Sequence, residues 1–254
     1  MSTQVMAQRA TGMGVLAGIH LLGNAALLWL GYYWLGLAES RTGTLLWSAL
    51  VALVLACLVC WLHGAAFARF RGAPVAGAFR QALRHLLPLL VAAIAIAVLY
   101  GYLQRWADYS REPAFRMASY FTLKLRKPVK PATVLRVFDG ALWLVRWMVL
   151  PVFLLPLVSG MAGRGWAGFA EIAHRARAWR YWIAVPVLLL CAFRLPFQLL
   201  GWTPRMGSFP MEMVSFVARL LAAYLLFVGA WLLLVFVTAG GRPVRSQSKR
   251  AVSP

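Results

Sequence analysis

The stretch TGTLLWSALVALVLACLVCWLHGAAFA, residues 42–68, decides the fold class of this chain. It runs for 27 residues without an Asp, Glu, Lys or Arg. About 20 apolar residues in a helix are enough to cross the hydrocarbon core of a bilayer, which is about 30 Å thick. Two other runs are equally free of charge, and three more each include a single Arg. We therefore predict an all-α integral membrane protein, a bundle of about six transmembrane helices at residues 12–37, 43–67, 86–104, 138–160, 181–202 and 213–239.

The composition excludes an ordinary soluble domain. Hydrophobic residues make up 62% of the 254 residues, against roughly 45–50% in soluble domains. The chain has 26 Lys and Arg against 6 Asp and Glu, a formal net charge of +20. These cations lie between the apolar runs, where they suit anionic lipid headgroups, so we predict membrane lipids rather than nucleic acid as the partner. Three Cys are too few for a disulfide framework.

The distribution of Lys and Arg predicts the orientation in the membrane. Six spans put both termini on one side, together with the connections after the second and fourth spans. Thirteen Lys and Arg lie on that side and ten on the other. Because cytoplasmic connections carry the excess of positive charge, we expect both termini in the cytoplasm and the protein in a bacterial cytoplasmic membrane. The first apolar run is longer than a signal-peptide core, so we interpret it as an uncleaved span.

The connections do not divide the chain into separate domains. Residues 1–241 are expected to form one transmembrane domain, followed by a disordered basic tail at residues 242–254. The connections that start at Gly72 and Gly163 both combine Arg with apolar residues at helical spacing. Since such amphipathic segments lie in the headgroup plane, we predict two basic interfacial helices, called elbows below, after spans two and four. The similar elbows indicate a duplicated half.

The longest polar stretch, residues 105–136, is expected to be a basic connecting loop. Within it SYFTLKLRKPVKP, residues 119–131, alternates apolar and polar side chains between Phe121 and Leu125. That pattern predicts a short exposed strand or an extended arm, ended by prolines. The stretch is either a solvated basic loop or, at residues 119–130, a docking surface for a protein partner or for lipid headgroups.

Three arginines inside predicted spans form the candidate site: Arg146, Arg194 and Arg219. A charge inside a bilayer costs at least about 2.5–3.5 kcal/mol, so it marks a functional site by default. These guanidinium groups would bind the phosphate or carboxylate of an anionic amphiphile, and Gln198 would add a polar contact. Two alternatives stay open: the arginines snorkel to the interface, or they pair with the acids Asp139 and Glu212 on neighbouring helices.

The first two spans carry four side chains that can ligate metals: His20, Cys57, Cys60 and His63. Their spacing lacks the i, i+4 pair typical of a helical metal site, so we interpret them as packing residues, with a metal or haem site as the alternative. Gly14 and Gly18 form a small-xxx-small pattern, which lets two helices approach closely. We expect the second helix to belong to the same chain rather than to another copy. We predict no metal and no cofactor.

No motif of a familiar enzyme class occurs in the sequence. It has no GxSxG, HExxH or GxxxxGK[ST] motif and no cluster of carboxylates for a metal ion. We therefore predict a non-enzymatic protein that binds or translocates an anionic amphiphile or lipid headgroup through its arginines. The alternative is an accessory or structural subunit of a larger membrane complex, without small-molecule chemistry of its own. A new kind of intramembrane enzyme is a further alternative.

Overall fold

The computed structural model describes residues 3–37, 40–171, 178–204 and 207–240. These residues form helices and short connections, and no strand occurs among them. The elements are α1 (Thr3–Leu35), α2 (Thr42–Phe70), α3 (Val75–Arg84), α4 (Leu86–Tyr109), α5 (Arg111–Leu125), α6 (Pro131–Leu144), the π-helical turn η1 (Val145–Val149), α7 (Leu150–Arg164), the 3₁₀ helix η2 (Gly165–Glu171), α8 (Trp179–Leu189), the π-helical turn η3 (Leu190–Arg194), α9 (Leu195–Gly201) and α10 (Phe209–Ala239).

Six helical segments within the described ranges are long and apolar enough to cross a membrane. They are Gly12–Leu35, Thr42–Phe70, Leu86–Tyr109, Pro131–Ala170, Trp179–Gly201 and Phe209–Ala239. Between 17% and 28% of each apolar stretch is buried inside the chain, so most side chains of every span remain available for lipid. The prediction of an all-α integral membrane protein with six spans is confirmed.

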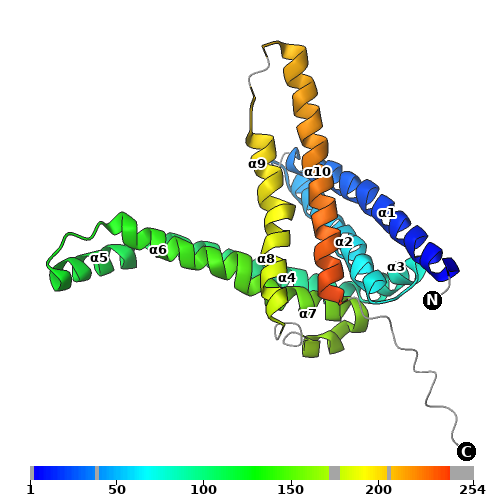
Figure 1. Cartoon of the computed structure of the whole chain (residues 1–254), viewed down its shortest axis with the longest axis horizontal. Coiled ribbons are helices and arrows are strands. Elements are labelled where there is room, and N and C mark those ends of the chain that lie inside the picture. Colours follow the sequence, from blue (N-terminus) through cyan, green and yellow to red (C-terminus); the bar gives the residue numbers. More distant parts are fainter. Residues whose placement is uncertain (1–2, 38–39, 172–177, 205–206, 241–254) are drawn as a thin grey trace, which may run out of the picture.

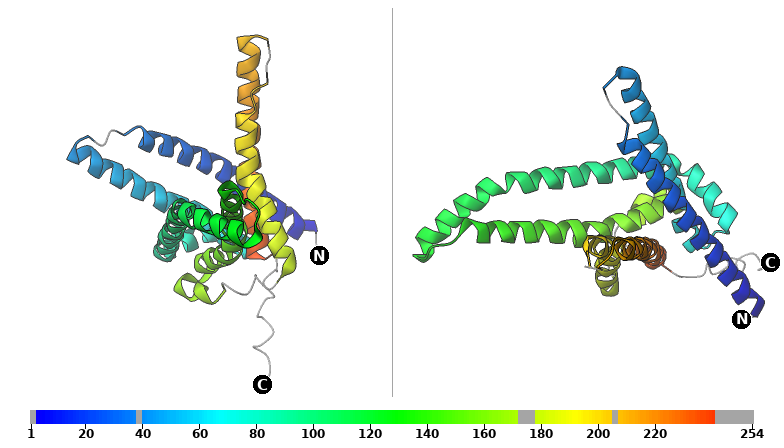
Figure 2. Two further views of the ribbon diagram at one scale, coloured as in Figure 1. Left: turned by 90° about the vertical axis from the view of Figure 1, so that its left-hand side faces the viewer. Right: turned by 90° about the horizontal axis from the view of Figure 1, so that it is seen from above.

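The spans are arranged as three helical hairpins that diverge from a common base (Figure 1). The first hairpin is α1 with α2, the second is α4 and α5 with α6 and α7, and the third is α8 and α9 with α10. Both views in Figure 2 show the same divergence. Transmembrane helices tilt by about 20° on average, so we expect a bilayer to bring the outer ends of the hairpins closer together.

The base is held together by apolar side chains from all three hairpins. Phe67 of α2, Leu89 of α4, Met161 of α7 and Val235 of α10 belong to one buried cluster. A second cluster adds α8 to α7 and α10. Because the hairpins contact one another mainly at the base, these contacts determine how the three hairpins are arranged relative to one another.

The elbow after the second span forms the helix α3, as predicted. It follows Gly72, whose φ of 110° is a conformation that few residues other than glycine adopt. Gln81 on α3 donates a hydrogen bond from Nε2 to the carbonyl oxygen of Gly163 (2.7 Å). Arg71 likewise donates from Nη1 to the carbonyl oxygen of Ser159 (2.7 Å). The elbow is therefore tied to the end of α7 as well as to its own span.

The elbow after the fourth span begins differently from the prediction. It starts at Gly165, with φ of 59°, and its first turns are the 3₁₀ helix η2 rather than an amphipathic α-helix. The backbone of η2 lies directly against that of α7, where Gly168 meets Gly160. The rest of this elbow, residues 172–177, lies outside the described residues, as does the predicted tail at 242–254.

The predicted loop at residues 105–136 is wrong, because the structure forms helix there. The segment predicted to be a strand belongs to the C-terminal half of α5, and Pro131 begins α6. The helical spacing of Ala114 and Ala118, four residues apart, determines the secondary structure here. Both are buried against Val134 of α6. The alternation around Phe121 is too short to outweigh this contact.

The second hairpin is longer than a bilayer is thick. Its returning segment, Pro131–Ala170, has 40 residues, about 60 Å of helix or twice the hydrocarbon core. Arg146 Nη2 donates to Gln104 Oε1 (3.1 Å), which places these residues at one level of the hairpin. Gln104 is the last residue of the third apolar run. Residues 105–145, called the arm below, therefore project beyond that end of the span (Figure 1).

Candidate anion-binding site

Arg219 lies where the third hairpin passes the end of α9. Its Nη1 donates to the carbonyl oxygens of Leu200 (3.2 Å) and Trp202, and its Nε donates to the carbonyl oxygen of Ser215 (3.2 Å). The free carbonyl oxygens at a helix C-terminus carry partial negative charge, which favours a cation at this point. Since Trp202 closes the fifth predicted span, Arg219 lies level with the end of that span.

Arg219 also lines a cavity of about 350 Å³ between the end of α9 and the start of α10. The cavity is bordered by Thr203, by the carboxylate-bearing Glu212 and by Phe216, over whose ring the guanidinium carbon lies at 5.9 Å. No ion pair joins Glu212 to Arg219 among the described residues. The hydrogen-bond partners of Arg219 are thus neutral oxygens, and its charge is not balanced by a bonded carboxylate.

Arg194 is deeper along the same hairpin. It ends the π-helical turn η3 and is exposed, and the neighbouring Gln198 on α9 is exposed as well. From Arg194 to Leu200 the helix rises by about 9 Å, so Arg194 lies below Arg219 on the hydrocarbon side. The π-helical turn precedes Pro196, which has no N–H to bond the preceding turn and so disturbs the helix.

Arg146 belongs to η1 and contacts α4, outside the site around Arg219. Besides the bond to Gln104, its carbonyl oxygen accepts a hydrogen bond from the Tyr100 hydroxyl (2.8 Å). The Nε atom of Arg146 is buried without a partner among the described residues. Asp139, an acid on the same predicted span, is exposed on the arm and forms no ion pair with Arg146 within the described chain.

The structure therefore separates the three arginines that the sequence grouped together. All three lie about seven to ten residues from one end of their apolar runs in the sequence. Their hydrogen-bond partners place Arg146 level with the end of the third span and Arg219 level with the end of the fifth. Gln104 and Thr203 could not be found from the sequence, because the residue that lies beside an Arg depends on how far each helix extends along its neighbour.

The small-residue pattern of α1 has open space beside it within the described residues. There, a Cβ atom added at Gly14 or at Gly18 would meet no other atom within 4 Å. The role of this pattern in helix packing stays a prediction. Neither glycine touches the arginine sites.

The histidines of the first two spans are brought together at the base. The rings of His20 and His63 have centroids 5.6 Å apart, and the ring of His63 meets that of Trp231 edge to face at 5.1 Å. No group of three or more His, Cys, Asp or Glu suited to a metal ion occurs within the described ranges. The two histidines share a buried contact, whereas Cys57 and Cys60 are half-buried free thiols.

Comparison with family models, with curated proteins and with solved structures finds no match.

Proposed function

We propose that this membrane protein binds an anionic amphiphile, or moves it across the bilayer, by holding the phosphate or carboxylate headgroup at Arg219. The observation that carries the proposal is the environment of the guanidinium. It lies at the level of the interface, its bonded partners among the described residues are neutral carbonyl oxygens, and it borders a cavity of about 350 Å³. An anion is the group that best neutralises a cation in that setting.

Arg194 and Arg146 extend this function in different ways. Arg194, one and a half turns deeper, offers a second cation along the path from the interface toward the hydrocarbon. Arg146 lies level with the end of the third span, at the same face of the membrane as Arg219. In the proposed orientation both termini and the elbows are cytoplasmic, and these two arginines face the outer leaflet of a bacterial cytoplasmic membrane.

The first test measures lipid retention in variants of the cavity at Arg219. The protein is reconstituted in nanodiscs that contain phosphatidylglycerol and examined by native mass spectrometry. Arg219→Gln is expected to lower the retained phosphatidylglycerol about tenfold, because a charge-assisted hydrogen bond contributes roughly 1.5–3 kcal/mol. Glu212→Gln is expected to raise it, since the variant removes a negative charge that borders the same cavity.

The matched control is Arg136→Gln, which removes the same charge from an exposed position on the arm. It is expected to retain phosphatidylglycerol like the wild type. Equal retention in the wild type, Arg219→Gln and Glu212→Gln would contradict the proposal. Arg219 would then only stabilise the C-terminal end of α9.

A second candidate function, that of an accessory subunit, is favoured by the tip of the arm. Residues 119–130 form the end of α5 and the turn into α6, beyond the end of the span (Figure 1). Leu123 is 80% exposed there and Tyr120 is exposed beside it, with the Lys124 ammonium 5.7 Å from the tyrosine ring centroid. Apolar side chains exposed to water beyond the membrane are typical of a protein contact.

Photo-crosslinking tests this second candidate. With a photoreactive amino acid in place of Leu123, we expect one protein adduct of defined mass in native membranes. The same replacement at Leu22, which is 77% exposed on the lipid-facing part of α1, is expected to give lipid adducts only. If both positions give the same adducts, the tip of the arm is not a protein interface.

A further inference from the structure

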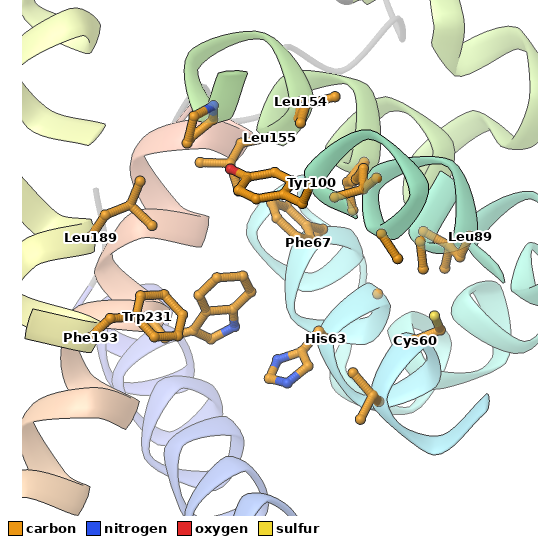
Figure 3. Close-up of a pocket in the computed structure, with 17 residues that line it drawn as sticks. Cys60, His63, Phe67, Leu89, Tyr100, Leu154, Leu155, Leu189, Phe193 and Trp231 are labelled. Carbon is orange, nitrogen blue, oxygen red and sulfur yellow. The ribbon is translucent and has the colours of Figure 1, made fainter. Parts of the chain in front are cut away.

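A cavity of about 450 Å³ lies at the base, where the three hairpins begin to diverge. Its walls come from α2, α4, α7, α8, η3 and α10 (Figure 3). Sites for small molecules in proteins have volumes of about 300–1,000 Å³, and this cavity falls in that range. It borders none of the three arginines discussed above and is therefore separate from the proposed anion site.

One end of the cavity carries polar groups without partners. His63 Nδ1 and Trp231 Nε1 are buried, and neither has a hydrogen-bond partner among the described residues. Figure 3 shows the indole nitrogen of Trp231 turned toward the imidazole of His63, beside which it lies at this end of the cavity. In the apolar interior of a membrane each unsatisfied polar group costs several kcal/mol. Two such groups beside one cavity indicate a ligand that bonds to them.

The rest of the lining determines what kind of ligand fits. Among the described residues no Lys, Arg, Asp or Glu borders the cavity, so a charged headgroup finds no partner in this lining. The aromatic rings of Phe67, Tyr100 and Phe193 line it instead, and they favour a planar ring by stacking or edge contacts. Tyr100 adds no free donor, because its hydroxyl bonds to the carbonyl oxygen of Arg146.

The cavity also has a way out to the lipid. Ala93 and Ala97 line it and are at the same time exposed on α4, as is Val59 on α2. A long apolar tail can therefore leave the cavity between these two helices and continue among the acyl chains. A metal ion is a poorer occupant, since His63 and Cys60 are the only metal-ligating side chains in this lining.

We infer that this cavity binds a lipid-soluble quinone: a neutral planar ring with carbonyl oxygens at its edge and an isoprenoid tail. A ring carbonyl accepts a hydrogen bond from His63 or Trp231, the ring lies among the aromatic side chains, and the tail extends past Ala93 into the bilayer. His63 and Trp231 are binding residues here, and no electron transfer is part of the inference. The site is independent of Arg219.

The test titrates the full-length protein in nanodiscs with decylubiquinone and follows the quenching of tryptophan fluorescence. Wild-type protein is expected to bind saturably. His63→Phe and Trp231→Phe are each expected to weaken binding about tenfold, which corresponds to about 1.4 kcal/mol for a lost hydrogen bond. Ala93→Phe, which fills the cavity and leaves both donors in place, is expected to abolish binding.

Two further variants separate a binding role from a folding role. His63→Gln keeps an N–H donor and is expected to bind more tightly than His63→Phe. Trp29→Phe makes the same change as Trp231→Phe in a different apolar cavity, between α1 and α2, and is expected to bind like the wild type. An unsaturable signal in the wild type, or equal binding in the wild type, Trp231→Phe and Ala93→Phe, overturns the inference.

The second measurement extracts the purified, never-titrated protein with organic solvent and counts quinone molecules per chain. Wild type and Arg219→Gln are expected to carry the same amount, because the two sites are separate. Ala93→Phe is expected to carry about tenfold less. A stoichiometric metal ion that is present in the wild type and lost in His63→Phe would show that the histidine holds a metal instead, and would overturn the inference.

Discussion

Gly168→Ala is expected to prevent the chain from reaching its folded state. A Cβ atom at this position in η2 would overlap the backbone of Gly160 and the amide nitrogen of Met161 on α7. Backbone atoms cannot rotate out of the way as a side-chain end can, so the 3₁₀ helix would have to move off α7. We expect a cost of about 3 kcal/mol or more, a large part of the 5–15 kcal/mol that stabilises most folded proteins. The measurement is the yield of monodisperse protein in size-exclusion chromatography, together with Tm in detergent.

Gly160→Ala is expected to have the same effect from the other side of the contact, because its Cβ would lie 2.5 Å from the carbonyl oxygen of Gly168. The matched controls are Gly101→Ala and Gly229→Ala, also in helices, where an added Cβ meets nothing within 4 Å. These two are expected to keep or raise Tm, since Ala favours a helix by up to about 1 kcal/mol over Gly. If Gly168→Ala is as well behaved as Gly101→Ala, η2 does not lie this close to α7.

The elements that the sequence predicted correctly are those that depend on long, uniform patterns. A span needs only some twenty apolar residues, and all six expected spans are found among the described residues. The elbow α3 was predictable because apolar and basic residues alternate at helical spacing after a Gly that takes a positive φ. Local composition and the thickness of a bilayer are sufficient for both.

The helices of the arm were not predicted, because the residues that indicate them are small. Ala114 and Ala118 carry little hydrophobic weight in a pattern, yet their size lets α5 and α6 approach each other around Val134. The more conspicuous alternation between Phe121 and Leu125 misled the prediction. The two alanines indicate a helix only once α5 is known to pack against α6. Local sequence does not show that contact.

The candidate site was missed in part for a related reason. Depth was counted from the first residue of each apolar run, as if every helix began at the membrane. The bond from Arg219 to Trp202 shows that α10 begins well beyond the end of α9, and the bond from Arg146 to Gln104 shows that α6 begins well beyond the level of Gln104. The buried contact of His63 with Trp231 joins residues from the second and sixth spans. No spacing along the chain indicates such a contact.

Thiol labelling is expected to put the arm outside the cell and the first elbow inside. In a chain whose three native cysteines are replaced by alanine, Ser119→Cys on the arm should react completely with a membrane-impermeant maleimide in intact cells. Ala76→Cys on α3 should react only after the membrane is permeabilised. Both side chains are exposed, and α4 crosses the membrane between them, so the two reporters must give opposite results.

The shape of the arm is the physical reason for this orientation. By simple count the two sides of the membrane differ by only three Lys and Arg. However, the arm carries Lys124, Arg126, Lys127 and Lys130 to its tip, about 30 Å of helix beyond Gln104. That distance is about three Debye lengths at physiological salt, so these four cations interact little with the headgroups. Without them the excess near the membrane on the side of the termini rises from three to seven, which favours the termini inside.

A third reporter distinguishes lipid from water. Ile94→Cys is exposed on the surface of α4 but lies in the middle of its span, where a thiol meets acyl chains and does not ionise. It is expected to stay unlabelled before and after permeabilisation. Labelling of Ala76→Cys in place of Ser119→Cys in intact cells would mean the opposite orientation. Labelling of both from outside would mean that α4 does not cross the membrane, and Ile94→Cys would then react as well, because water reaches both faces of a helix that lies outside the hydrocarbon.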